Sequence, residues 1–132
     1  MGKLAFIFPG QASQYVGMGL DWYQNLPFAK EMFQKADEIV GYELSKVCFE
    51  GPEEALKQTR VTQPAIFVHS IVVAAWLREQ GIQPDITAGH SLGEYSALVA
   101  AGGGDFESVL TVVQTRGDLM QKVGEDRHQD TG

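Results

Sequence analysis

The chain has 132 residues, a formal net charge of −7 and an apolar content of 44%. This length fits one domain or a piece of a larger one, and the apolar content excludes wholesale disorder. The negative charge argues against nucleic acid or an anionic membrane as a partner, because both would repel it. The apolar run at the N-terminus is too short for a signal peptide, and no run reaches the ~18 apolar residues of a membrane span, so we expect a cytoplasmic protein.

The cysteine and histidine content limits the chemistry. Cys48 is the only cysteine, which excludes an intrachain disulfide and fits a reducing compartment. We expect it to be a small buried apolar residue. The three histidines, His69, His90 and His128, are far apart in the sequence, and no ligand pair has helical spacing. The sequence therefore predicts no metal site.

The first half of the chain predicts one strand followed by helices. Residues 4–8 are an apolar run closed by Pro9-Gly10, which is typical of a buried strand that ends in a turn. Residues 11–19 are polar and rich in glycine, so we expect a loop there. Helical patterns follow at residues 21–23, from Pro27 to a stop at Gly41, and from Gly51-Pro52-Glu53-Glu54 onward. Residues 42–49 have a weaker pattern, which fits either a helix or a turn.

The second half predicts a buried helix, a second strand and another helix. Residues 64–80, with Thr62 as the expected cap, are apolar on most faces, which is typical of a helix in the interior. Residues 84–89 predict a short strand that leads into a tight turn at His90-Ser91. Residues 92–101 are small and apolar, so we expect a helix that packs closely on a sheet.

The last part of the chain predicts one more helix, and the order of all the predicted elements indicates the fold class. Asp105 is expected to cap a last helix that runs to about Val123, and residues 124–132, which lack periodicity, are expected to form a disordered tail. The alternation of strands and helices predicts an α/β fold with a parallel sheet. Only two strands are predicted, and two strands are not a viable sheet by themselves, so we expect this fold to be incomplete.

Residues 89–93, Gly-His-Ser-Leu-Gly, match the G-x-S-x-G pattern of a nucleophilic serine. Such a serine lies on a strained turn between a strand and a helix, and flanking glycines are needed to avoid clashes. The turn lifts the Ser91 hydroxyl out of the sheet and directs the backbone N–H of Leu92 toward a developing oxyanion. An ordinary glycine-flanked turn is the alternative, but the strand before the motif and the helix after it favour a nucleophile.

None of the histidines is a convincing base for this serine. A serine hydroxyl is a weak nucleophile until a base takes its proton. His90 is adjacent in sequence, but neighbours on a turn usually point in different directions. His69 belongs to the expected buried helix and His128 to the expected tail. The residues alone therefore predict a nucleophile without its base.

Four groups of residues resemble the acyl-carrier-protein malonyltransferases in order and spacing. They are Gly10-Gln11-Ala12-Ser13-Gln14 with Gly17-Met18-Gly19, Val61-Thr62-Gln63-Pro64-Ala65, Gly89-His90-Ser91-Leu92-Gly93-Glu94-Tyr95, and Arg116-Gly117 with Met120-Gln121. The resemblance spans roughly residues 3–123. It implies part of an α/β-hydrolase-like large subdomain, with parallel strands and packed helices, that lacks the family's ferredoxin-like insert.

The resemblance implies roles for the matching residues. Ser91 would attack the thioester of malonyl-CoA and hold the malonyl group as an ester until the thiol of acyl carrier protein takes it. Gln11 and Leu92 would form the oxyanion hole through their backbone N–H groups. Arg116 would bind the free malonyl carboxylate, because a guanidinium binds a carboxylate in bidentate fashion and stays charged when desolvated.

The resemblance also implies what the site does not use. Gln63 would line the acyl pocket, and His90 would be a neighbour of the nucleophile without acting as its base. No cofactor or metal is needed, because the thioester substrate arrives activated. The family's general-base histidine belongs to a later segment that this sequence lacks. We therefore expect a fragment of a malonyltransferase of fatty-acid biosynthesis, with little activity by itself and monomeric in its full-length form.

Two other interpretations remain open. The first is a serine esterase or thioesterase, which would have no need of a cation for a carboxylated acyl group. The second is a non-catalytic remnant or interaction module, whose partner binding would be unchanged by Ser91→Ala. One departure from the family is visible within the first motif, because Ala12 stands where the family often has glycine.

Overall fold

The computed structural model describes residues 2–131, and it describes side chains for residues 2–127. Within this range, two parallel strands combine with helices, so the predicted α/β fold class is confirmed. The elements in chain order are β1 (Ala5–Phe8), α1 (Leu20–Asn25), α2 (Pro27–Val40), α3 (Leu44–Glu50), α4 (Glu53–Leu56), α5 (Thr59–Glu79), β2 (Ile86–Gly89), α6 (Gly93–Ala100) and α7 (Phe106–Thr131).

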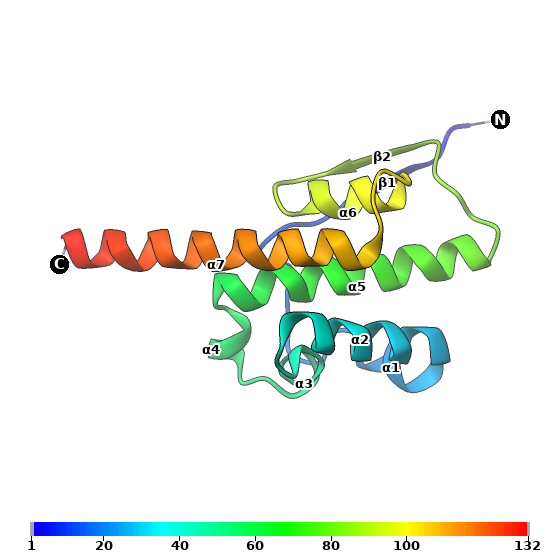
Figure 1. The fold of residues 1–132 in the computed structure, drawn as a ribbon. Coiled ribbons are helices and arrows are strands. Elements are labelled where there is room, and N and C mark those ends of the chain that lie inside the picture. The colour runs from blue at the N-terminus through cyan, green and yellow to red at the C-terminus, as the bar shows by residue number, and fades with distance from the viewer. Residues whose placement is uncertain (1, 132) are drawn as a thin grey trace.

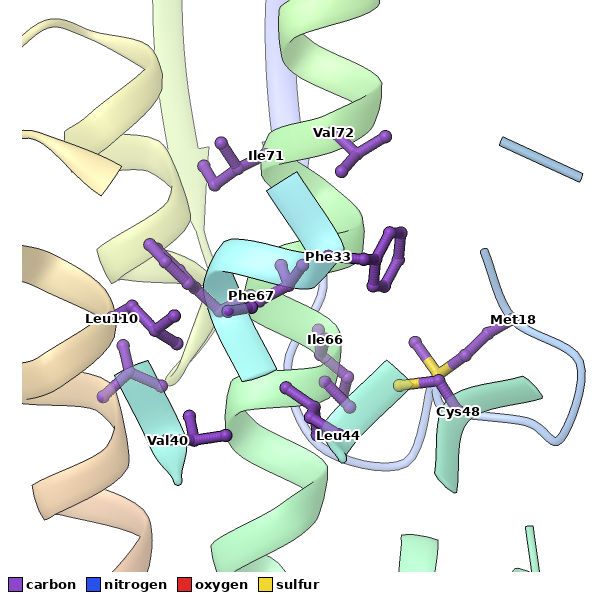
Figure 2. Packing of buried hydrophobic residues seen from close by; sticks show 14 of the residues in the cluster. Met18, Phe33, Val40, Leu44, Cys48, Ile66, Phe67, Ile71, Val72 and Leu110 are labelled. Carbon is purple, nitrogen blue, oxygen red and sulfur yellow. The ribbon is translucent and has the colours of Figure 1, made fainter. Parts of the chain in front are cut away.

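Helix α5 lies at the centre of the core. It packs side by side with α7, its most extensive partner, while α2 and α3 cover its other side (Figure 1). The reason is the sequence of α5, which is apolar on most faces and therefore has to be surrounded. Figure 2 shows buried side chains from these helices and the loop before α1 in one cluster, including Met18, Phe33, Val40, Leu44, Cys48, Ile66, Phe67, Ile71, Val72 and Leu110.

The burial of α5 shows whether this long apolar helix is a membrane span or a helix of the protein core. Among the described helices, α5 is long and apolar enough to cross a membrane, but 61% of its apolar window lies buried inside the protein. A helix covered by its own chain in this way is a core helix. Its last turns, residues 73–77, are only half-buried, which differs from the burial expected over the whole helix.

The start of α5 differs from the prediction. The helix begins at Thr59, so Thr62 is an internal residue and not its cap. The Thr62 hydroxyl lies within hydrogen-bond distance of the carbonyl groups of Leu56 and Gln58, which precede the helix and share its one proton. This shared bond satisfies backbone acceptors just upstream, and the helix continues through Pro64. Proline is usually found in the first turn of a helix, but Pro64 lies further inside α5.

The two strands pair in parallel from Ala5 opposite Ile86 to Phe8 opposite Gly89, and α6 packs against one face (Figure 1). The prediction that the first strand is buried is wrong for its other face. The side chains of Ile7 and Ile86 are 79% and 62% exposed, because no described element covers that face. Alternate side chains of a strand point to opposite faces, so only half of β1 reaches the core.

Helix α7 begins where the sequence predicts but ends later. The Asp105 carboxylate accepts a hydrogen bond from the Ser108 N–H at 2.8 Å, and this bond lowers the pKa of Asp105. The expectation of a disordered tail at 124–132 differs from the structure, since residues 124–131 continue the helix and Gly132 lies outside the described residues. Charged and amide side chains sustain a helix without apolar periodicity, and Gln121 donates to Glu125 one turn later at 3.1 Å.

Cys48 provides a test of the core. Its side chain is 0% exposed, and burial raises its pKa to about 12. Alkylation requires the thiolate, so at pH 8 we expect iodoacetamide to label the native chain at least about a hundredfold more slowly than the chain unfolded in guanidinium chloride. Mass spectrometry over time measures both rates. Native labelling as fast as that of the unfolded chain would contradict the burial of this thiol.

Candidate active site

The parallel pairing of β1 and β2 brings two loops to the same edge of the sheet. Phe8 and Gly89, the last residues of the two strands, lie opposite each other. The His90 N–H donates to the Phe8 carbonyl at 3.2 Å. Gly10 lies so close to this turn that an added Cβ would stand 2.6 Å from the His90 carbonyl oxygen. The loop that carries Gln11 therefore lies beside the turn that carries the candidate nucleophile.

Ser91 has the strained backbone that the G-x-S-x-G pattern predicts. Its φ angle is 55°, in the left-handed region that residues other than glycine rarely adopt. A Cβ on Gly89 would lie 2.0 Å from the Gly93 carbonyl group, and a Cβ on Gly93 would lie 2.1 Å from the Phe8 carbonyl oxygen. Both glycines are thus required by close backbone contacts, and the turn holds Ser91 exposed between strand and helix.

Two backbone N–H groups near Ser91 are free to donate. In the part of the chain that the structure describes, neither Gln11 N–H nor Leu92 N–H forms a hydrogen bond within the protein. Leu92 directly follows Ser91 at the start of α6, and Gln11 follows β1. The Gln11 side chain is held separately, by a 3.1 Å hydrogen bond from its amide to the Thr59 hydroxyl. Free donors at one edge are what an oxyanion hole requires.

Arg116, from α7, meets Ser91 directly. Its Nη2 donates to the Ser91 Oγ at 3.2 Å, and its Nη1 donates to the Gln63 Oε1 at 2.7 Å. The guanidinium also lies over the Tyr95 ring, 5.6 Å from the ring centroid. Helices α5 and α6 therefore each place a side chain against this cation from α7, and the serine and the arginine share one site.

Two residues of this arrangement, Tyr95 and Met120, received no role from the sequence. Tyr95 contacts the Arg116 guanidinium, and the Met120 sulfur accepts a hydrogen bond from the Gln63 amide at 3.1 Å. A signal from sequence position was available for both. Met120 follows Arg116 by one turn of α7, and residues at that spacing share a helix face. Tyr95 follows Ser91 by four residues and lies in the first turn of α6, directly after the serine turn.

The described histidines do not pair with Ser91. His69 is half-buried in α5, where burial lowers its pKa. His90 is exposed, and among the described side chains only Arg116 forms a hydrogen bond with the Ser91 hydroxyl. The side chain of His128 lies outside the described residues. In the same range, no three His, Cys, Asp or Glu side chains gather as they would around a metal ion.

An open, shallow depression lies beside Arg116 on the exposed surface of α7, and its lining residues all belong to this one helix. Its lining is mostly apolar and includes Val112, Leu119 and Met120 together with the arginine. A cation 3.2 Å from an exposed hydroxyl, beside an apolar surface, suits a small acyl group that carries a negative charge at its far end.

This serine turn and Arg116 lie within a stretch of the chain that matches a known class of transferases. A family model described as the acyl transferase domain matches residues 5–130, and the chain belongs to this family. Within it, the chain is similar to the malonyl CoA-acyl carrier protein transacylase of Bacillus subtilis (strain 168), with 50% identity over 122 residues that cover 92% of this chain and 38% of the relative. The corresponding enzyme of Escherichia coli (strain K12) is 44% identical over 123 residues, covering 92% of this chain and 40% of the relative.

Solved structures agree with this assignment. The malonyl-CoA:ACP transacylase of Synechocystis sp. PCC 6803 matches with a TM-score of 0.88 and 47% identity, over 92% of this chain and 41% of that one. A malonyl-transacylase in complex with its type II PKS acyl-carrier protein matches with a TM-score of 0.86 and 43% identity, over 92% and 40% of the two chains. The resemblance inferred from the sequence is thereby confirmed. The chain spans about two fifths of the length of these relatives.

The glycines around Ser91 can be tested by adding one methyl group. Gly93→Ala places a Cβ against the Phe8 carbonyl oxygen, and relief requires the backbone to move, so we expect a loss of about 3 kcal/mol or more in the free energy of unfolding. Gly124→Ala is the matched control, because a Cβ there meets nothing within 4 Å and alanine favours helix, with an expected gain of up to about 1 kcal/mol. Urea unfolding followed by circular dichroism measures both changes, and similar effects of the two substitutions would contradict the close contact.

Ala12 provides a second test near the site. Its φ angle is 88°, in the left-handed region where a Cβ is strained and glycine is not. We expect Ala12→Gly to raise the free energy of unfolding by about 0.5–1 kcal/mol after the added entropy of the unfolded chain is subtracted. Ala101→Gly, at an exposed position with φ −82°, has no strain to release and should lower it. Equal losses from both variants would show that Ala12 is unstrained.

Proposed function

We propose that this chain carries the nucleophile-bearing part of a malonyl-CoA:acyl-carrier-protein transacylase. Ser91 takes a malonyl group from malonyl-CoA and passes it to the thiol of acyl carrier protein, in fatty-acid biosynthesis. The observation that carries this proposal is the 3.2 Å contact between the Arg116 guanidinium and the Ser91 hydroxyl. The names of the relatives point to the same reaction.

The distance between cation and nucleophile favours malonyl over other acyl groups. In a malonyl thioester, one methylene separates the carbonyl carbon under attack from the carboxylate. A cation that binds this carboxylate therefore has to lie within a few ångströms of the nucleophile, as Arg116 does. A guanidinium suits this role because it offers two parallel donors to one carboxylate and keeps its charge when water is excluded.

The reaction proceeds in two acyl transfers. The Ser91 oxygen attacks the thioester carbonyl, a C–O bond forms, and the C–S bond breaks to release the thiol of coenzyme A. The thiol of acyl carrier protein then attacks the ester and regenerates the hydroxyl. The free N–H groups of Gln11 and Leu92 are placed to stabilise the oxyanion of each step, worth roughly 3 kcal/mol per donor in comparable enzymes. His90 neighbours the nucleophile, and the proton transfers need a base that the described side chains do not place at Ser91.

The whole protein is proposed to resemble its relatives in architecture and partners. The parallel strands, α6 behind the serine turn and the buried α5 fit part of an α/β-hydrolase-like large subdomain, without the ferredoxin-like insert. The exposed face of the strands fits a fold with further elements. We propose acyl carrier protein and malonyl-CoA as partners, a monomeric full-length form and a cytoplasmic location, the last supported by the free, buried Cys48.

Acylation of the chain tests this function. Incubation with radiolabelled malonyl-CoA, followed by mass spectrometry of peptides, should find slow formation of malonyl ester on Ser91 and none on the Ser91→Ala variant. We expect a preference for malonyl-CoA over acetyl-CoA of roughly a hundredfold, from two charge-assisted hydrogen bonds to the carboxylate. Arg116→Gln should remove this preference, and Arg116→Lys should keep part of it because the charge remains without the planar fork.

The alternatives give different results in the same experiment. A serine esterase or thioesterase would release acetyl and malonyl groups to water at similar rates, and Arg116→Gln would leave their ratio unchanged. An interaction module would show no ester on Ser91 with either thioester. Either outcome would overturn the proposed function.

A further inference from the structure

We infer that Gln63 is a positioning residue, which holds the Arg116 guanidinium against Ser91 and does not itself contact the acyl group. This inference rests on the proposed function and deepens it. It also changes the role expected for Gln63 from the sequence, which was to line the acyl pocket. The argument depends on where the two ends of the Gln63 amide lie and on what they contact.

Both ends of the Gln63 amide are occupied inside the protein. The side chain is 1% exposed. Its Oε1 accepts the 2.7 Å hydrogen bond from Arg116 Nη1, and its Nε2 donates the 3.1 Å hydrogen bond to the Met120 sulfur. A side chain that is buried and bonded at both ends leaves no surface for a substrate. What it can do is fix the group that it holds.

The chemistry of the partners sets the orientation of the amide. A guanidinium has only donors, so it requires the amide oxygen. The amide nitrogen then faces Met120, whose thioether is an acceptor, although a weak one. A flipped amide would oppose donor to donor at Arg116. Arg116 and Met120 are one turn apart on α7, so both face Gln63 on the neighbouring α5.

The amide is also suited to this task because it carries no charge. Among the described side chains no carboxylate pairs with Arg116, whereas Lys35 pairs with Glu107 and Lys57 with Glu53. A neutral acceptor restricts the guanidinium and leaves its positive charge for a carboxylate ligand. A glutamate at position 63 would hold the guanidinium as well, but it would compensate the charge that the ligand needs.

The geometry predicts what Gln63 contributes to binding. The Tyr95 ring restricts one face of the guanidinium. Gln63 accepts the shorter of its two hydrogen bonds, 2.7 Å against 3.2 Å, and this leaves Nη2 at the Ser91 hydroxyl. Without the amide, the long arginine side chain regains rotamer freedom, and a carboxylate would have to order it on binding. Preference for carboxylated ligands should therefore fall although Arg116 itself is unchanged.

The test measures binding of malonate and acetate to the chain by NMR titration, together with the guanidinium N–H signals of Arg116. The wild-type chain should prefer malonate and show sharp guanidinium signals. Gln63→Leu should lower the malonate-to-acetate preference about tenfold and broaden those signals. Gln63→Glu should keep the signals sharp while also losing the preference, because the guanidinium stays fixed but its charge is compensated.

The matched control is Gln114→Leu. Gln114 lies on the same helix as Arg116, but its amide donates to the Val40 carbonyl at 2.8 Å, away from the site. This variant should lose stability and keep both the malonate preference and the sharp signals. A purely structural role of Gln63 would make Gln63→Leu behave like this control, and that result would overturn the inference.

Two further outcomes separate the inference from the proposed function. If the wild-type chain does not prefer malonate over acetate, the proposed function fails. If it does and the folded Gln63→Leu variant keeps the full preference, only the positioning role fails. Should Gln63→Leu not fold, Met120→Leu decides, since Met120 is 44% exposed and its loss releases the amide nitrogen. A preference about threefold lower supports the inference, and an unchanged preference overturns it.

Discussion

The site depends on a close approach of backbone to backbone behind Ser91. The end of β1, the end of β2 and the first turn of α6 meet at Gly89 and Gly93 with no room for a Cβ on either glycine. This contact forces the serine into the left-handed region and leaves its hydroxyl exposed. The same contact brings the loop of Gln11 next to the turn, because the two strands are parallel and end in register. The pairing of the two strands and the backbone conformation of Ser91 therefore depend on the same backbone contacts.

The second half of the site comes from the packing of α5 on α7. These helices are the main pair of the hydrophobic core, so the interface that stabilises the fold also places Gln63 against Arg116. The interior side of the interface is apolar, with Phe67 and Leu110 among its buried residues (Figure 2). At its edge the interface becomes polar and meets Ser91. A change in the relative position of the two helices would move the guanidinium directly, which links the stability of the core to the selectivity proposed for the site.

The uncovered face of the two strands has a different character. Ile7 and Ile86 remain largely exposed, although the apolar run of residues 4–8 predicted a buried strand, since the described chain supplies α6 to one face only. A continuous apolar run in a strand indicates that both faces can be buried, and a layer of other elements has to cover each face for the burial to occur. The sequence pattern was therefore sound as a prediction of strands, and wrong about the exposure of the outer face.

The sequence by itself determined the α/β class, the strand-to-helix turn at Ser91, the glycine stop of α2 and the Asp105 cap, because each follows from local backbone rules. It also placed Arg116 among the candidate residues, but only through a family resemblance. The tertiary structure decided what local rules cannot reach. It showed that Gln63 contacts both Arg116 and Met120, because these residues meet only where α5 packs on α7. It also showed that residues 124–131 remain helical, although they have no apolar face from which a helix could be predicted.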